Sequence, residues 1–408
     1  MKNPTELFDF AGRKDVYWYG NINQEQNWEQ TKAFPVFTDT VQNELVVQQE
    51  QQLLLAASSK DHVIFSHQPD PSFLCYLKEK GVTLPHIIRK EDAANQSGLL
   101  VPYLLDETIY DEPFARQKSI YGSNPVLVKH LNHKIFTRKW AEQNNFTVTR
   151  GAVCNHLTEL KSTYDQLKME NFEKFVLKIP YGSSGKGLRI FKSDQEFNQI
   201  LTFIKRRAES AELLLEGWHR TKRSLNAQLL IQEEGSYLLS VTEQLIDEDG
   251  VYMGTDFTPV YEEDRLLEYE TCMKRLMDLL LKEGYRGIVG VDSIIDEKDE
   301  LIPIIEMNAR FTQVTYLLST ISRFLTKYSF LESRFKRFDC TAERAFEDIL
   351  NELNQTLCPD EDGGFLIYTF GKTEAAGNWH YRVFILFYSV NQSKQSSMIT
   401  TFEQFIFS

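Results

Sequence analysis

The N-terminal third of the chain alternates short apolar runs with amphipathic stretches. Residues 16–19 and 62–66 form apolar runs of strand length, and a Gln- and Glu-rich helix is expected between them, near residues 42–57. Another helix follows and is expected to end at Gly81. Because alternating strands and helices are typical of a parallel sheet, the pattern predicts a small α/β domain, which we bound at residues 1–125.

The middle of the chain contains longer helices between strand-like segments. A helix is expected over residues 132–144. Ser193 and Glu196 have the spacing of a capping box, in which the two side chains satisfy backbone N–H groups at a helix start. A long amphipathic helix is expected over residues 264–284, ending at a glycine. These elements indicate a second folded unit that begins near residue 126.

Two apolar runs late in this unit are expected to pair as a β-hairpin. Strands over residues 288–295 and 301–310 are joined by a polar turn at residues 296–300. Counting outward from the middle of the turn places Asp292 roughly across from Glu306. So apolar a strand pair rarely buries two carboxylates without a compensating charge, and the hairpin therefore needs such a charge.

The polar side chains of this hairpin have the chemistry of a metal site. Because side chains alternate along a strand, Glu306, Asn308 and Arg310 point to one face. Mg²⁺ takes hard oxygen ligands, commonly one or two carboxylates together with phosphate groups. Arg310 can neutralise a carboxylate or the charge that develops on one. The alternative is the solvent-facing polar side of an edge hairpin.

A glycine-rich loop follows the apolar strand expected at residues 175–179, which itself carries Lys178. Successive free N–H groups form an anion-binding concavity, and glycine lets the backbone approach phosphate oxygens closely. The Walker A pattern fails, because Pro180 stands where its first Gly should be and Gly187 where Ser or Thr should be. A plain surface turn is the alternative. The loop comprises Gly182, Ser183, Ser184, Gly185, Lys186 and Gly187.

Composition limits the classes of partner. The chain has 45 Lys and Arg residues against 58 Asp and Glu residues, and its net charge of −13 repels polyanions, so we expect no nucleic-acid partner. The N-terminus lacks the apolar core of a signal peptide, and no apolar run reaches the roughly 18–20 residues that span a bilayer. We therefore expect a cytoplasmic protein that binds no membrane. Five scattered cysteines without a C-x-x-C spacing argue against a disulfide framework or a zinc site.

Two weaker candidates gain meaning from their order along the chain. A lysine in a helix, Lys134, is uninformative alone, and so is an apolar run that ends at Glu216 and leads into Trp218 and His219. With the glycine-rich loop and the hairpin carboxylates, however, these residues occur in the order found in ATP-grasp ligases. Residues 126–320 resemble that family.

The resemblance implies that ATP and Mg²⁺, with Mn²⁺ as an alternative, are held between two α+β lobes. The expected ATP-binding residues are the glycine-rich loop, Lys134, Lys178, Glu216, Trp218 and His219. The expected metal ligands are Asp292, Glu306 and Asn308. The expected catalytic residues are Arg310, which would bind an acyl phosphate, and Lys186. Residues 222–226 lack the Glu that binds ribose in many members, so the ribose contact stays unassigned.

More narrowly, the chain resembles ATP-grasp ligases with extra domains on both sides. The expected divisions are a pre-ATP-grasp α/β domain at residues 1–125, an α+β ATP-grasp domain at 126–325 and a small C-terminal domain at 326–408. This group includes pheganomycin-type peptide ligases and ligases that load L-glutamate onto an acyl-carrier protein in aminoglycoside antibiotic biosynthesis. The resemblance implies an ATP-dependent carboxylate ligase that works through an acyl phosphate.

The acceptor divides the hypotheses. The preferred one joins L-glutamate to the thiol of an acyl-carrier protein, and the alternative is an amide bond to a small amine. A third, an ATP-binding regulatory protein without turnover, is disfavoured by the intact polar set of the hairpin. Because carrier proteins are usually acidic, docking needs a local basic patch, for which Arg334, Lys336 and Arg337 are candidates. The alternative for these three residues is a solvated helix face.

Overall fold

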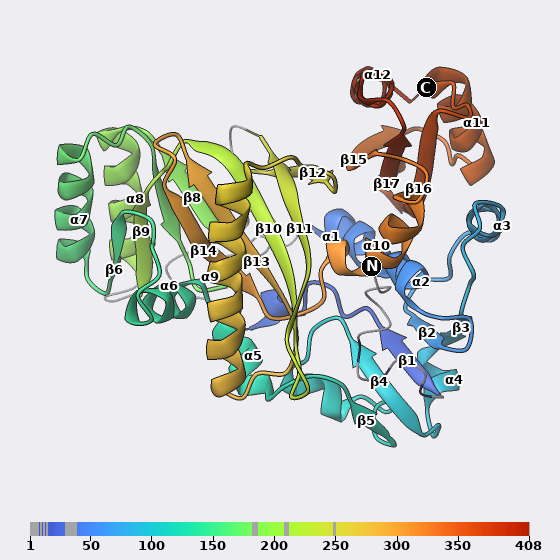
Figure 1. Ribbon diagram of the computed structural model, residues 1–408, viewed down its shortest axis with the longest axis horizontal. Helices are drawn as coiled ribbons and strands as arrows, with labels where there is room; N and C mark the ends of the chain where they lie inside the picture. The colour runs from blue at the N-terminus through green and yellow to red at the C-terminus, as the bar shows by residue number, and fades with distance from the viewer. Residues whose placement is uncertain are drawn as a thin grey trace.

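The computed structural model describes residues 8, 10, 13, 15–28, 39–181, 187–207, 212–247 and 250–407, apart from the side chain of Arg207. Within these residues the strands form sheets of five, four and eight members. Figure 1 shows the four-stranded sheet beside one end of the eight-stranded sheet, whose other end is formed by the C-terminal strands above the N-terminal sheet. No helix in the described part of the chain is long and apolar enough to cross a membrane.

The N-terminal segment folds around a parallel five-stranded sheet, which confirms the α/β prediction. Its strand order is β3-β2-β1-β4-β5. The stretch that follows residue 102 also belongs to this sheet, because it supplies the edge strand β5. The strands are β1 (Val16–Tyr19), β2 (His62–Phe65), β3 (His86–Arg89), β4 (Gly98–Pro102) and β5 (Lys118–Ile120). The helices are α1 (Thr40–Val47), α2 (Leu53–Ala56), α3 (Pro71–Glu79) and α4 (Lys90–Ala93), with 3-10 turns at Gln24–Asn27, Gln48–Gln52 and Glu107–Asp111.

The four-stranded sheet forms a small lobe with two helices on one face (Figure 1). Apolar residues of α7 and α8, among them Leu160 and Phe197, pack against the strands. The capping box at the start of α8 is confirmed, because Ser193 N donates to Glu196 Oε2 at 3.0 Å and Glu196 N donates to Ser193 Oγ at 3.2 Å. The elements are β6 (Gly151–Cys154), β7 (Phe175–Lys178), β8 (Leu188–Phe191), β9 (Leu213–Gly217), α7 (Leu157–Met169) and α8 (Asp194–Arg207).

The eight-stranded sheet has the order β14-β13-β10-β11-β12-β15-β17-β16. The long helix α9 (Glu263–Lys282) packs against β10, β11 and β14 at one end of the sheet, through buried residues such as Tyr269 and Leu276. The sheet strands are β10 (Thr221–Ile231), β11 (Tyr237–Ile246), β12 (Tyr252–Asp256), β13 (Gly287–Asp296), β14 (Leu301–Asn308), β15 (Phe330–Cys340), β16 (Gly363–Ala375) and β17 (Asn378–Ser389). The remaining helices are α5 (Pro125–Leu131), α6 (Lys134–Gln143), α10 (Gln313–Phe324), α11 (Phe346–Leu357) and α12 (Gln392–Gln404).

The C-terminal strands continue the sheet of the middle segment. β15 pairs with β12 on one side and with β17 on the other. A backbone ladder therefore joins residues on both sides of the expected boundary at 325/326. We propose that the divisions at 125/126 and 325/326 separate units of different function even though the sheet crosses the second one.

The three basic residues suggested as a docking patch lie on a strand and are already engaged. Arg334 Nε lies 3.0 Å from Glu403 Oε1, and Lys336 Nζ donates to carbonyl oxygens near the end of α12 at 2.9 and 3.0 Å. Arg337 donates to Gln42 Oε1 at 2.8 Å. Cations stabilise helix C-termini, where carbonyl groups lack partners, so Lys336 holds the end of α12 on β15. Arg334 adds an ion pair to α12, and Arg337 connects β15 to the first turn of α1. The interpretation as a solvated helix face is wrong, because the three residues lie on a strand. Their use as a docking patch stays a prediction, although all three side chains have partners within the chain.

The outer edge of β16 is capped by two glutamine side chains from the N-terminal segment. Gln51 donates to the carbonyl of Phe370 at 2.9 Å and accepts from its N–H at 2.7 Å. Gln48 makes the same pair with Lys372, at 2.8 and 3.0 Å. Each amide therefore acts as a substitute neighbouring strand, which protects an edge that would otherwise expose unpaired backbone groups.

Replacing Gln51 by Leu should lower the free energy of unfolding by about 1–3 kcal/mol, because it leaves buried backbone groups of Phe370 without partners. Urea denaturation measures this change, and amide hydrogen exchange should speed up in β16. Gln166→Leu is the control, since Gln166 is an exposed residue of α7 that contacts only Glu170 in the described structure. Equal protection of β16 in wild type and Gln51→Leu would contradict the capping role.

Candidate active site between the two central sheets

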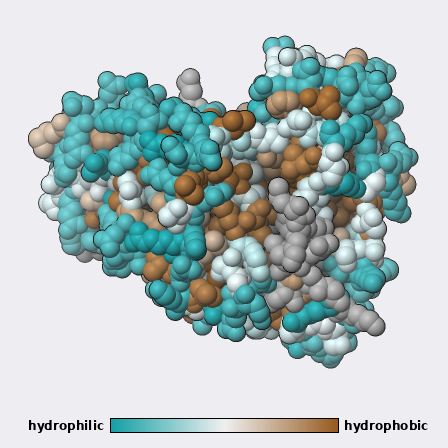
Figure 2. Space-filling model, viewed as in Figure 1, coloured by the Kyte–Doolittle hydropathy of each residue, from teal (hydrophilic) through white to brown (hydrophobic). Residues whose placement is uncertain are grey.

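A cavity of about 780 Å³ lies between the four-stranded and eight-stranded sheets and reaches the N-terminal and C-terminal segments. Figure 2 shows apolar side chains gathered in the hollow along the middle of this face. The volume is in the range of small-molecule sites in proteins. Its lining residues from the small lobe include Val176, Lys178, Leu188 and Glu216, and those from the large sheet include Asn226, Gln244, Asp292, Ile294, Ile305, Glu306, Asn308 and Arg310.

Two carboxylates face each other on one wall of this cavity. Asp292 on β13 is the direct register partner of Glu306 on β14, as the sequence predicted. Burial and the charge of Glu306 raise the pKa of Asp292 to about 6. Two negative charges on directly paired residues repel each other, so the carboxylate pair favours the binding of a cation.

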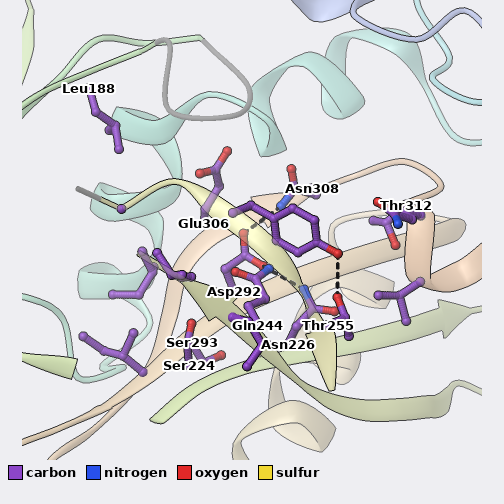
Figure 3. A pocket seen from close by; sticks show the side chains of 18 of the residues that line it. Leu188, Ser224, Asn226, Gln244, Thr255, Asp292, Ser293, Glu306, Asn308 and Thr312 are labelled. Atoms are coloured by element: carbon purple, nitrogen blue, oxygen red, sulfur yellow. Dashed lines mark hydrogen bonds between the residues drawn. The ribbon is translucent and has the colours of Figure 1, made fainter. Parts of the chain in front are cut away.

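A set of amide donors holds Asp292 in place (Figure 3). Asn226 Nδ2 and Gln244 Nε2 each donate to Asp292 Oδ1 at 2.7 Å, and Asn308 Nδ2 donates to Oδ2 at 3.2 Å. Behind them, Gln228 Nε2 donates to Asn226 Oδ1 at 2.6 Å. These bonds fix the direction of the carboxylate without cancelling its charge, because amides are neutral donors.

Cationic side chains surround the carboxylate pair. Lys134 Nζ, at the start of α6, lies 2.6 Å from Glu306 Oε1. Arg310 Nη2 donates to Asn308 Oδ1 at 2.8 Å and lies 3.4 Å from Glu25 Oε1. The structure therefore brings together five residues that the sequence singled out from two distant segments: Lys134, Asp292, Glu306, Asn308 and Arg310.

A second ion-pair cluster lies in the small lobe, around Glu216. This side chain is 2% exposed, and its two oxygens lie 2.6 Å from Lys178 Nζ and 2.6 Å from Arg138 Nη1. Burial would raise the pKa of Glu216, but the charges of Lys178 and Arg138 outweigh it and hold that pKa below its usual value. Glu216 and Lys178 therefore line the cavity as an ion pair.

The hinge residues after Glu216 also line the cavity. His219 is held on both ring nitrogens, by Asp296 Oδ2 at 3.2 Å and by the backbone N–H of Arg150 at 3.1 Å. The ring of Trp218 lies 4.2 Å from the Lys174 ammonium. Gly187 is buried, and its carbonyl accepts from Ile179 N at 3.1 Å. The other loop candidates, Gly182, Ser183, Ser184, Gly185 and Lys186, lie outside the described residues.

The donor set on the large sheet fits a divalent metal ion. Asp292 and Glu306 offer carboxylate oxygens and Asn308 an amide oxygen, which are the hard ligands that Mg²⁺ binds. Burial and then the charge of Glu306 raise the pKa of Asp292, and the charges of Arg310 and Lys134 offset that rise only in part. A bound cation would lower this pKa further.

Comparisons with known proteins agree with this geometry. Residues 132–314 match the family model described as an ATP-grasp domain. The chain is 38% identical to the [butirosin acyl-carrier protein]–L-glutamate ligase of Niallia circulans. The matched region is 398 residues long and covers 96% of this chain and 94% of that protein. The chain belongs to the ATP-grasp family of ligases.

Solved structures show the fold of this ATP-grasp ligase in other enzymes. An N5-carboxyaminoimidazole ribonucleotide synthetase in complex with ADP has a TM-score of 0.58 at 11% identity, with 96% of each chain covered. A phosphoribosylamine–glycine ligase from Thermotoga maritima has 0.57 at 15% identity, again with 96% of each chain covered. A biotin carboxylase from Campylobacter jejuni has 0.55 at 9% identity, covering 97% of this chain and 92% of that one. The α+β ATP-grasp fold is therefore confirmed.

Family membership confirms the class of reaction and of cofactor. The ATP-grasp ligase is an ATP-dependent ligase that uses ATP and a divalent metal ion. The expected regulatory alternative without turnover has no support from these relatives. The roles of single residues stay predictions, which the geometry above makes specific.

Sequence reasoning missed the residues that position the charged ones. Asn226 and Gln228 alternate with Leu225, Ala227 and Leu229 on an otherwise apolar strand, so their shared face was a readable signal. Gln244 carried no such signal, because its role depends on strand pairing across the sheet.

Arg138 is a second omission with a readable signal. It lies four residues after Lys134, one turn further along the same side of α6, and donates to both Glu142 and Glu216. Successive turns of α6 therefore place one cation on Glu306 of the large sheet and the next on Glu216 of the small lobe.

Replacing Glu216 by Gln should lower the free energy of unfolding by about 3–5 kcal/mol, because Arg138 and Lys178 lose their buried counter-charge. The control is Glu142→Gln, which removes the exposed partner of the same arginine and should lower it by less than about 1 kcal/mol. Chemical denaturation measures both variants. Equal effects would show that burial does not distinguish the two ion pairs.

Proposed function

We propose that this ATP-grasp ligase joins L-glutamate to the phosphopantetheine thiol of an acyl-carrier protein, in a pathway of the butirosin type for aminoglycoside antibiotics. The observation that carries the proposal is the 38% identity to the Niallia circulans ligase over 96% of the chain. The matched region extends beyond the ATP-grasp domain at residues 132–314. It includes N-terminal and C-terminal segments that also line the cavity, for example at Glu25 and Arg382.

The proposed reaction has two steps. A carboxylate oxygen of glutamate attacks the γ-phosphorus of ATP, which forms an acyl phosphate and releases ADP. The thiolate of the carrier arm then attacks the acyl carbon and expels inorganic phosphate, leaving a thioester. The reaction needs no protein nucleophile, so positioning and charge neutralisation are the tasks of the side chains.

The large-sheet residues take the charged parts of this reaction. Asp292, Glu306 and Asn308 would hold Mg²⁺, or Mn²⁺ in its place, and the ion when bound offsets phosphate charge. Lys134 lies 2.6 Å from Glu306, so it can serve the metal site and the phosphates together. Arg310 can bind the acyl phosphate, because its guanidinium is anchored by Asn308 and lines the cavity.

The small lobe provides the remaining contacts with ATP. Lys178 would bind phosphate. Glu216 would still have Arg138 as a counter-charge if Lys178 moved from its ion pair with Glu216 to the phosphate. Adenine would lie near the hinge from Glu216 to His219, between apolar side chains of the two sheets such as Val176 and Ile294. The roles of Lys186 and of loop residues 182–185 rest on the sequence alone.

A second candidate is an amide-forming amino-acid or peptide ligase with a small amine acceptor. It is favoured by one observation: Arg334, Lys336 and Arg337, suggested for docking an acidic carrier, hold α12 and α1 instead. The overall charge of −13 gives a carrier protein no general attraction.

Intact-mass spectrometry of a phosphopantetheinylated carrier protein tests the proposal. With enzyme, Mg²⁺, ATP and glutamate, we expect a mass gain of one glutamyl group together with ADP release. The carrier protein without its phosphopantetheine arm should gain no mass, because it lacks the thiol. If the holo carrier gains no mass while a free amine yields ADP and an amide product, the second candidate replaces the first.

A further inference from the structure

The guanidinium of Arg382 lies in the wall of the same cavity, in the part formed by the C-terminal segment. Arg382 is on β17 and stacks against Phe335 and Phe384, with its guanidinium carbon 5.0 and 4.9 Å from the ring centroids. Within the described residues its side chain has no ion pair and no hydrogen bond, and its buried Nε has no acceptor. A guanidinium in this state lacks the partner that buried charges normally have.

The surroundings of Arg382 make the burial of its positive charge more unfavourable. Its register partner on β15 is Arg337, a like charge directly across the strand pair. Burial, followed by the charge of Arg337, lowers the pKa of Arg382 to about 10. An anion bound in the cavity would relieve both effects, and none of the carboxylates that line the cavity is paired with Arg382.

Other arginines near the cavity have polar side-chain partners. Arg310 reaches Glu25 and Asn308, although its Nε has no acceptor, and Arg138 reaches Glu216. Arg382 therefore differs from them, because the described contacts of its side chain are with aromatic rings alone. A rigid planar fork without a protein acceptor suits a carboxylate from outside, which it can bind through two parallel N–H···O bonds.

The first turn of α10 connects this part of the cavity to the catalytic end. Gln313 donates to the hydroxyl of Tyr368, a neighbour of Arg382, whereas Tyr316 lies near Arg310 and Tyr103. Residues three apart are neighbours on one helix face, so Gln313 and Tyr316 form one wall of the cavity, which both Arg310 and Arg382 also line. Two buried donors of the cavity lining, the Tyr316 hydroxyl and Gln52 Nε2, have no partner in the described structure.

We propose that Arg382 binds the second carboxylate of a dicarboxylic amino acid, the one that is not activated, while the first lies near Arg310. The assignment rests on the proposed function for the identity of the acid as glutamate. It explains how the enzyme selects a dicarboxylate: a substrate with one carboxylate would leave the Arg382 guanidinium buried and unpaired.

Steady-state ADP release tests the proposal, with Arg382→Gln as the variant and Arg337→Gln as the matched control. Arg337 is exposed and faces Arg382 across the strand pair but does not line the cavity. We expect Arg382→Gln to raise the KM for glutamate by on the order of 10- to 100-fold, the range for a charged hydrogen bond. The KM for ATP should change less than about twofold in both variants, and Arg337→Gln should change the KM for glutamate much less than Arg382→Gln, because it leaves the Arg382 guanidinium in place.

Analogues with one carboxylate provide an independent readout. Wild type should prefer glutamate over L-glutamine and 4-aminobutyrate, each of which lacks one of the two carboxylates. Arg382→Gln should lose most of that preference against one of them, and this analogue identifies the carboxylate that Arg382 binds. Arg382→Lys keeps the charge without the planar fork, so it should fall between wild type and Arg382→Gln and provides a milder substitution should Arg382→Gln not fold.

Failure of this inference is separable from failure of the proposed function. If wild type uses glutamate and Arg382→Gln leaves its KM and its selectivity unchanged, the Arg382 assignment is wrong and the proposed function stands. If wild type does not use glutamate, the proposed function is wrong, and the same variants are measured with the acid that supports ADP release. A monocarboxylic acid, or an unchanged KM for a dicarboxylic one, would then overturn the Arg382 assignment as well.

Discussion

The opposition of Asp292 and Glu306 across β13 and β14 is the constraint on which the rest of the site depends. Two carboxylates on an apolar strand pair repel each other, and burial makes the repulsion stronger because the local dielectric is low. The fold orients Asp292 with neutral donors, namely Asn226, Gln244 and Asn308, which leave its negative charge in place, while Lys134 contacts Glu306. Bound positive charge would reduce the repulsion between the two carboxylates, and the metal ion of a metal–nucleotide complex can provide it.

The cations around this pair come from separate parts of the chain, which ties the site to the assembly of the whole fold. Lys134 arrives from α6, whose next turn carries Arg138 to the small lobe, so one helix serves both sides of the cavity. Arg310 is anchored partly by Glu25 of the N-terminal segment. Glutamines from that segment also cap the edge strand β16. The two flanking segments therefore shape the cavity as well as enclosing it.

The sequence predicted the local elements and the carboxylate register, because alternation along strands and the length of a hairpin turn determine which side chains face each other. It failed where the answer depended on distant pairing. Arg334 and Lys336 resemble a basic surface patch in sequence, but in the fold α12 packs beside β15 and its residues Phe402 and Glu403 contact both side chains. Gln244 reaches Asp292 only because β11 lies beside β10 in the sheet. The unpaired state of Arg382 likewise appears only when β15 and β17 are placed together.

The central claim is that the Asp292–Glu306 pair binds ATP through a divalent metal ion, and calorimetry with a non-hydrolysable ATP analogue tests it directly. Wild type should bind the analogue more tightly with Mg²⁺ than with a chelator. Glu306→Gln should lose most of that magnesium dependence, a change of at least about tenfold in affinity, since even indirect metal partners contribute that much. Glu300→Gln, in the exposed turn of the same hairpin, should behave as wild type. If Glu306→Gln keeps the full magnesium dependence, the metal binds elsewhere and the account is wrong.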